Sequence, residues 1–319
     1  MNSSMDTVEI IFRPDRQRPQ YSDQMWSFCL GLEDKFPGTV IRKDEEPHTV
    51  EAPSITLCGE HGPNIHYLAV PEGRELEVFL DAVRSLLIGA TPDEASVVQL
   101  GKLDPPAEIL VFMASACPNC PHVVSDAVRL ALGSSMVRVL IIDVQQYESL
   151  SSEFGVRSVP LTVFDRSLSI TGMIKVQDMV QKILSRGSVQ YETETMDSAM
   201  HQGRFDHAAD LVFRINGPDI LVSLWKDSTT SRRMGIMLTV QKVLARDPKA
   251  LDGTVPDLVA LLGIGDASIR GDTADLLGQI GHADAVDALK ALSDDPNPDV
   301  AEIAQEAIEE ILEKAGDKA

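Results

Sequence analysis

The sequence has few cysteines and few basic residues. Only four of its 319 residues are cysteine, and 28 Lys and Arg stand against 49 Asp and Glu, which gives a net charge of −21. Four cysteines in a chain of this length argue against the disulfide-stapled scaffold of a small secreted protein. The acidic balance argues against binding to nucleic acid, whose phosphates need basic patches, and equally against binding to an anionic membrane surface.

Long hydrophobic runs are also missing. No stretch reaches the roughly 18 consecutive apolar residues that a membrane-spanning helix needs. The first residues, MNSSMDTVEIIFRPDRQ, lack the basic region, apolar core and small-residue cleavage site of a secretory signal. We therefore expect a soluble, cytoplasmic protein. In a reducing compartment, a close pair of cysteines indicates redox catalysis or metal binding.

Two successive parts of the chain have the same predicted order of elements. Hydrophobic residues make up 44% of the chain, and its length favours two or three domains. Residues 1–90 are predicted as strand, helix, three strands and helix, and residues 91–188 repeat this order after one extra leading helix. This order indicates an internal duplication that places Pro53 opposite Pro160. The predicted strands are 8–12, 39–44, 54–59, 64–70, 108–114, 137–144, 158–165 and 168–172, and the predicted helices are 22–36, 75–89, 91–103, 123–132, 147–155 and 176–187.

Residues 189–319 have helical periodicity throughout. VPDLVALLGIGDASIRGDTADLLGQIG (255–281) can be laid over AVDALKALSDDPNPDVAEIAQEAIEEI (285–311). A weaker copy lies at 217–246, and residues 199–216 are predicted as a degenerate cap. A helix-pair repeat of this length predicts a short α-solenoid. The expected fold class is therefore α/β followed by all-α.

Cys117 and Cys120 form the one close pair of cysteines. They lie in ASACPNCPHVV (114–124), directly after the apolar strand EILVFMA, at the start of a predicted helix, and before a later Val-Pro-strand segment. A CxxC pair alone is a weak signal, but in this context it indicates dithiol redox chemistry. A metal site is the alternative, although zinc usually takes four ligands and no second CxxC exists. An inert pair is the third reading. The spare ligand candidates are Cys29, Cys58, His61, His66 and His122.

The other two cysteines have simpler explanations. Cys29 lies on the apolar stripe of a predicted helix, and Cys58 follows an apolar strand. We expect both to be buried, with a regulatory thiol as the alternative. His122 either lowers the thiol pKa when it is protonated or points into solvent.

The cysteine motif and the segments around it resemble a known fold. LVFMASACPNCPHVV, followed by VRSVPLTVF, resembles the thioredoxin or glutaredoxin-like fold. The doubled arrangement resembles the tandem thioredoxin-fold protein disulfide oxidoreductases of prokaryotes and the N-terminal domain of the alkyl hydroperoxide reductase flavoprotein. APSITLCGEHGPNIHYLAVPEGRELEVFLDAV is similar to the inactive N-terminal half of such proteins. The resemblance covers residues 6–187, and the remaining part resembles HEAT-type repeats.

The resemblance implies a role for each residue of the motif. Cys117 becomes the nucleophile, Cys120 the resolving thiol, and Pro160 the cis-proline beside them. Val159 would offer its backbone to a substrate chain. The remaining motif neighbours are Pro118, Asn119, Pro121 and His122.

The sequence departs from the resemblance at two places. RPDRQRP (13–19) stands in the first half where a dithiol would lie, so a two-site isomerase is not expected. Val111 holds the position at which thioredoxin keeps a buried aspartate.

These residue types suit disulfide exchange. The thiolate attacks a disulfide, and a free cysteine with a pKa of ~8.5 is mostly protonated at neutral pH. Unpaired amide groups and the helix dipole at a helix N-terminus favour the anion. Attack by Cys117 gives a mixed disulfide, which Cys120 then resolves.

We therefore expect a thiol–disulfide oxidoreductase that reduces a disulfide-bearing protein substrate. It needs a redox-active disulfide but no bound cofactor, no GxGxxG fingerprint for a dinucleotide is present, and a separate flavin-dependent, thioredoxin-reductase-like donor would supply electrons. The helical repeats would dock a protein partner. The alternatives are a non-catalytic, redox-switched scaffold and a metal-binding CxxC site.

Overall fold

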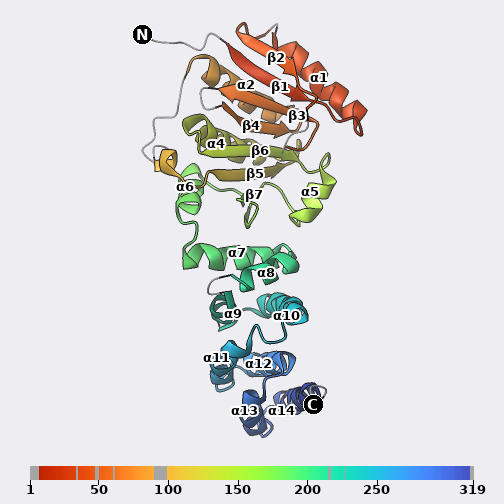
Figure 1. The fold of residues 1–319 in the computed structure, drawn as a ribbon, viewed down its shortest axis with the longest axis vertical. Coiled ribbons are helices and arrows are strands. Elements are labelled where there is room, and N and C mark those ends of the chain that lie inside the picture. Colours follow the sequence, from red (N-terminus) through yellow and green to blue (C-terminus); the bar gives the residue numbers. More distant parts are fainter. Residues whose placement is uncertain are drawn as a thin grey trace. The chain divides into compact units, whose positions relative to one another are not determined.

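The chain forms two compact units, residues 1–186 and residues 187–319 (Figure 1). The computed structural model describes residues 7–33, 35–46, 50–59, 62–89, 99–214, 217–226 and 228–316. The first unit combines a sheet with helices, and the second consists of helices. None of the helices within the described ranges is long and apolar enough to cross a membrane.

The described strands of the first unit form one mixed sheet of eight strands in the order β2-β1-β3-β4-β6-β5-β7-β8. Strand β4 pairs with β6 in parallel, and this pairing joins the strands of the first half of the unit to those of the second. The strands are β1 (Val8–Arg13), β2 (Thr39–Lys43), β3 (Ser54–Gly59), β4 (Gly62–Leu68), β5 (Ala107–Met113), β6 (Val137–Asp143), β7 (Leu161–Phe164) and β8 (Leu168–Thr171).

The central strands are buried on both faces, as their continuous apolar sequences predict. In β5, the side chains from Ile109 to Phe112 are all fully buried. Phe112 packs against Phe154, which follows α5 (Glu148–Glu153), at a ring distance of 5.4 Å. Since successive side chains of a strand point to opposite faces, Val111 faces away from Phe154.

Four longer helices of the first unit are α1 (Pro19–Glu33), α2 (Arg74–Leu87), α4 (Cys120–Gly133) and α6 (Val176–Leu184). Helix α2 packs against α4. It also packs against α1, where the ring of Phe79 meets the ring of Phe28 edge-on at a centroid distance of 5.2 Å. The side-chain amide of Asn64 on β4 donates to the carbonyls of Ala131 (2.7 Å) and Val137 (3.1 Å), which lie at the end of α4 and the start of β6. The two halves of the sheet are thus also tied together by α2 and by this buried amide.

The predicted strands are confirmed, with ends that differ by up to three residues. The predicted helix 22–36 begins earlier, at Pro19, because a proline is tolerated in the first turn, where amide groups have no helical partner. The predicted helix 91–103 falls largely on residues 90–98, which lie outside the described ranges, and Gln99–Lys102 forms a single 3₁₀ turn.

The second unit is a series of helix pairs, each packed on the next. The predicted pairs within 217–246, 255–281 and 285–311 are confirmed, and the expected cap is a full helix pair that starts at Val189. The helices are α7 (Val189–His201), α8 (Phe205–Val212), α9 (Gly217–Lys226), α10 (Thr230–Arg246), α11 (Val255–Leu261), α12 (Ala267–Ile280), α13 (Val286–Leu292) and α14 (Pro298–Gly316).

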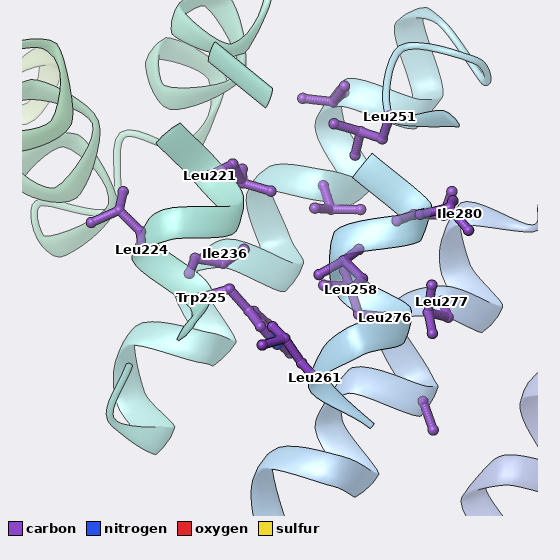
Figure 2. Packing of buried hydrophobic residues seen from close by; sticks show 14 of the residues in the cluster. Leu221, Leu224, Trp225, Ile236, Leu251, Leu258, Leu261, Leu276, Leu277 and Ile280 are labelled. Atoms are coloured by element: carbon purple, nitrogen blue, oxygen red, sulfur yellow. The ribbon is translucent and has the colours of Figure 1, made fainter. Parts of the chain in front are cut away.

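One hydrophobic core runs through these pairs, and Figure 2 shows Leu221, Leu258 and Leu277 filling the space between successive helices. Trp225 is fully buried and its indole nitrogen donates to Thr273 Oγ1 at 3.0 Å, which connects α9 to α12. The helical periodicity of the sequence therefore corresponds to a continuous core, in which each pair covers the apolar face of its neighbour.

Buried arginines add polar connections between successive pairs. Arg233 on α10 donates to Asp272 and Ser268 of α12. Arg270 on α12 in turn donates through two nitrogens to both carboxylate oxygens of Asp295, at 2.7 and 2.8 Å, ahead of α14. The side chain of Asp295 is 5% exposed, so this bidentate pair is shielded from water.

The substitution Asp295→Ala is expected to destabilise the helical unit, because it removes both carboxylate acceptors of the Arg270 guanidinium, whose side chain is largely shielded from water. Asp287→Ala is the matched control, since Asp287 is 97% exposed in its pair with Lys290 and is expected to change stability by less than about 0.5 kcal/mol. Amide hydrogen exchange of peptides covering α12 and α14 measures the difference. Equal protection in the two variants would contradict a stabilising role of the buried pair.

Candidate active site

The two cysteines lie where β5 leads into α4. The chain turns after Met113, and the Cys117 amide donates to the Ala114 carbonyl at 2.9 Å. Helix α4 begins at Cys120 rather than at the predicted Val123, and the Cys120 amide donates to Cys117 Sγ at 3.2 Å. The first amide groups of a helix have no helical acceptor, and here the amide of Cys120 donates to the Cys117 sulfur instead.

The two sulfurs differ in accessibility. Cys117 is half-buried, whereas Cys120 is fully buried behind it, and both are free thiols. Burial raises the pKa of the Cys120 thiol, a side-chain hydrogen bond with Cys117 raises it further, and the negative charge of Glu75 adds to the rise. Cys120 is therefore held as a thiol, while Cys117 is the sulfur that an incoming molecule can reach.

Val159 and Pro160 lie beside the dithiol. The Val159 carbonyl oxygen accepts a contact from Cys117 Sγ at 3.8 Å, and the Val159–Pro160 peptide bond is cis. The Gly172 amide donates to the Pro160 carbonyl at 2.8 Å, which places the loop after β8 against this proline. The structure thus brings together Cys117, Cys120, Val159 and Pro160 from segments more than forty positions apart in the sequence.

The remaining motif residues flank the two cysteines. Pro118 and Asn119 are exposed between the cysteines, and Pro121 lies in the first turn of α4. His122 is exposed on the next position of the helix.

Cys29 and Cys58 lie apart from the dithiol. Cys29 is fully buried in α1, as predicted, and burial raises the pKa of its thiol to about 12. Cys58 is only half-buried, at an irregularity in the pairing of β3 with β4, and burial raises its pKa to about 11. Across the part of the chain that the structure describes, no group of three or more His, Cys, Asp or Glu residues is placed to hold a metal ion.

Glu75 is a functional candidate that the sequence analysis missed. It is the second residue of α2, in the first half of the unit, and is 3% exposed. Neither carboxylate oxygen has a hydrogen-bond partner within the described residues, and burial raises the pKa of Glu75 from 4.5 to about 7. Because α2 packs on α4, this carboxyl group lies where its charge acts on Cys120.

The signal for Glu75 was present in the sequence. Glu75, Phe79, Ala82 and Val83 recur at helical spacing and form the buried stripe of α2. A carboxylate in line with an apolar stripe is unusual, because burying a charge is costly unless it is paired. The position of Val111, where a carboxylate was noted as absent, is apolar and fully buried in the structure.

In the first half of the unit, Arg18 makes a contact that parallels one made by Cys117 in the second half. Its guanidinium donates to the carbonyl of Ala52, which precedes a cis peptide bond to Pro53, much as Cys117 contacts the carbonyl before Pro160. The same guanidinium donates to the Gln146 carbonyl at 2.9 Å and stacks over the ring of Tyr147 at 4.2 Å. In the first half, a guanidinium thus lies at the carbonyl that precedes a cis-proline.

Comparisons with known proteins identify the fold of the first unit. Residues 107–185 match the thioredoxin domain family. The NTD_N/C domain of the alkylhydroperoxide reductase AhpF from Enterococcus faecalis is similar, with 21% identity, a TM-score of 0.51, and coverage of 56% of this chain and 90% of that domain. A protein disulfide oxidoreductase from Aeropyrum pernix has 16% identity, the same TM-score of 0.51, and coverage of 57% of this chain and 87% of that one.

A search of curated protein sequences gave no significant match. The identities to the solved structures are low, so these likenesses establish the fold. The chain has a thioredoxin-like α/β region, followed by a helical region.

The substitution Glu75→Gln is expected to stabilise the protein at alkaline pH. A folded-state pKa raised from 4.5 to about 7 means that the folded chain holds this proton more tightly than the unfolded chain, so stability falls as pH rises through that window. Removing the charge should therefore increase the free energy of unfolding by about 2–3 kcal/mol more at pH 8 than at pH 5. Urea unfolding at the two pH values measures this difference.

Glu77→Gln on the same helix is the matched control, because the Glu77 side chain is 71% exposed. It should leave the dependence of stability on pH unchanged. A Glu75→Gln gain of the same size at both pH values would show that the Glu75 carboxyl ionises as freely in the folded chain as in the unfolded one.

Proposed function

We propose that the chain is a dithiol–disulfide oxidoreductase that reduces protein disulfides through Cys117 and Cys120. The observation that carries the proposal is the asymmetry of the pair. A half-buried sulfur accepts the first amide of a helix, while a fully buried thiol lies behind it. Such an arrangement separates an attacking sulfur from a resolving one.

The first step joins the enzyme to its substrate. The Cys117 thiolate attacks one sulfur of the substrate disulfide, and a Cys117–substrate disulfide forms as the substrate S–S bond breaks. The other substrate sulfur leaves as a thiolate and takes a proton from solvent. The backbone of Val159 and the ring of Pro160, which border Cys117, would align the substrate chain. Pro118, Asn119 and Pro121 frame this loop.

The second step releases the substrate and needs a proton acceptor for Cys120. Glu75, with a pKa of about 7, is ionised in part of the molecules at neutral pH and can accept this proton. The Cys120 thiolate then attacks Cys117 Sγ, the mixed disulfide breaks, and the second substrate sulfur leaves as a thiolate that takes a proton from solvent. Two electrons have moved from the dithiol to the substrate, and the chain holds a Cys117–Cys120 disulfide.

A two-electron donor must then reduce this disulfide, and the redox-active disulfide itself needs no bound cofactor. We assign the donor to a separate flavin-dependent reductase of the thioredoxin-reductase type, in a reducing compartment such as the cytoplasm. The neighbour named as an alkylhydroperoxide reductase supports a reductase as the partner that supplies the electrons.

The proposal also divides the chain into three domains. Residues 1–90 would be a second thioredoxin-like domain without a dithiol, 91–188 the domain with CPNC, and 189–319 a HEAT-type solenoid. The shared order of strands and the contact of Arg18 with the carbonyl before a cis-proline support the first division. The stacked helix pairs with buried arginine connections support the solenoid, whose exposed surface would dock a protein partner.

Substitution of the cysteines tests the proposal. Cys117→Ser and Cys120→Ser should each reduce turnover of a protein disulfide by more than about a hundredfold. Only Cys120→Ser should accumulate a covalent complex with the substrate, because its Cys117 still attacks but nothing resolves the product. Non-reducing electrophoresis with mass analysis detects that complex. Cys58→Ser, which changes a half-buried thiol outside the site, should retain activity within about twofold.

Three other results would redirect the assignment. A Cys117→Ser chain that keeps its cellular function would favour the non-catalytic scaffold, and metal bound to protein purified without chelators would favour the CxxC metal site. The reduction potential of the pair decides the direction of exchange: near about −270 mV it is a reductant, whereas near about −180 to −120 mV it is an isomerase or oxidant.

A further inference from the structure

A second unpartnered polar group lies in the same buried layer as Glu75. Tyr67 on β4 is 1% exposed, and its hydroxyl has no hydrogen-bond partner within the described residues. Its ring packs edge-on against Phe79 of α2, with the centroids 5.0 Å apart. Phe79 and Glu75 are one helical turn apart and share a face of α2, so Tyr67 and Glu75 border the same space beneath this helix.

Three buried polar atoms therefore share this space without a protein partner, namely the Tyr67 hydroxyl and both oxygens of Glu75. Buried groups of this kind are normally satisfied, and an ordered water that makes about three hydrogen bonds is the usual means. We propose that one buried water bridges the Tyr67 hydroxyl to the Glu75 carboxylate, and that Tyr67 is the positioning residue that sets the pH at which Glu75 takes the proton of Cys120. The consequence for exchange rests on the function proposed above.

The protonation of Tyr67 fits this role. Burial raises the pKa of the Tyr67 hydroxyl, and the Glu75 carboxylate raises it further, so the hydroxyl keeps its proton at physiological pH. A phenol that donates through a water favours the ionised form of a carboxylate, which opposes the effect of burial on Glu75. Without that donation, the Glu75 proton would bind more tightly and Cys120 would be activated only at higher pH.

Three other titratable groups on neighbouring elements differ from Tyr67 in position or in partner. From α4, Cys120 is the thiol on which the Glu75 charge acts, and it is the proton donor of the proposed reaction. From α1, Tyr21 has its own partner, since its hydroxyl accepts from the Val70 amide at 3.2 Å. His66 is adjacent to Tyr67 in β4 and therefore points to the opposite face, where it and Arg13 bond to Thr56.

Thr162 provides an internal comparison. Its hydroxyl is also fully buried without a partner within the described residues. The strand pairings place Tyr67, Ile141, Val111 and Thr162 in one row across β4, β6, β5 and β7, on the face that α2 and α4 cover. Three strand spacings of about 4.8 Å separate Thr162 from Tyr67, too far for one water to reach both.

The substitution Tyr67→Phe tests the inference, because it removes the hydroxyl and retains the ring that packs on Phe79. The pKa of Glu75, measured by carboxyl carbon NMR on protein with ¹³C-labelled glutamate, should rise by about one unit. The rising limb of the disulfide-exchange rate against pH should move by the same amount, so that exchange at pH 6.5 slows by about tenfold and exchange at pH 9 changes by less than about twofold. Thr162→Val should change neither quantity.

The two readouts separate this inference from the proposed function. An unchanged Glu75 pKa in Tyr67→Phe overturns the inference, whatever the activity. An equal shift in Thr162→Val also overturns it, since the effect would then be a general response of the core. If Tyr67→Phe shifts the Glu75 pKa but the wild-type chain exchanges no disulfide at any pH, the proposed function is overturned. The connection between Tyr67 and Glu75 then still holds.

Discussion

The parallel pairing of β4 with β6 is the contact on which the candidate site depends. It joins two sets of strands into one sheet and thereby sets α2 beside α4. Helix α4 carries the buried thiol of Cys120 and α2 carries Glu75, so this pairing sets the helix with the buried carboxyl group against the helix with the buried thiol. The same pairing continues the row of side chains from Tyr67 through Ile141 to Val111. The surroundings of the dithiol are thus built from both halves of the unit.

Stability and reactivity oppose each other at this place. Burial of Glu75 without a protein partner disfavours its ionised form, and the same burial brings its pKa close to neutrality. A carboxyl group that ionises freely at pH 4.5 would be a weak acceptor for a thiol proton, because the most effective acid–base groups have pKa values near the working pH. The cost in folding free energy and the suitability for proton transfer therefore have one physical origin.

Most of the fold and the dithiol could be predicted from the sequence because their signals are local. Apolar runs such as EILVFMA mark buried strands, and Cys117 and Cys120 are separated by two residues. Glu75 could not be assigned a role in this way, since its partner on α4 lies 45 positions away and only the sheet order brings them together. The start of α4 at Cys120, three residues before the predicted start at Val123, also escaped prediction, because a proline such as Pro121 is tolerated in the first turn of a helix.

The contacts of Arg18 have a mechanical consequence for the first unit. One guanidinium bonds to Ala52 and Gln146 and stacks on Tyr147, so the segment before α1 is fastened to the loop that follows β6. The two halves of the shared sheet are therefore joined by a side chain as well as by strand pairing. A load applied to the first half of the unit would pass directly to the loop after β6, and residues 1–186 would respond to it as one body.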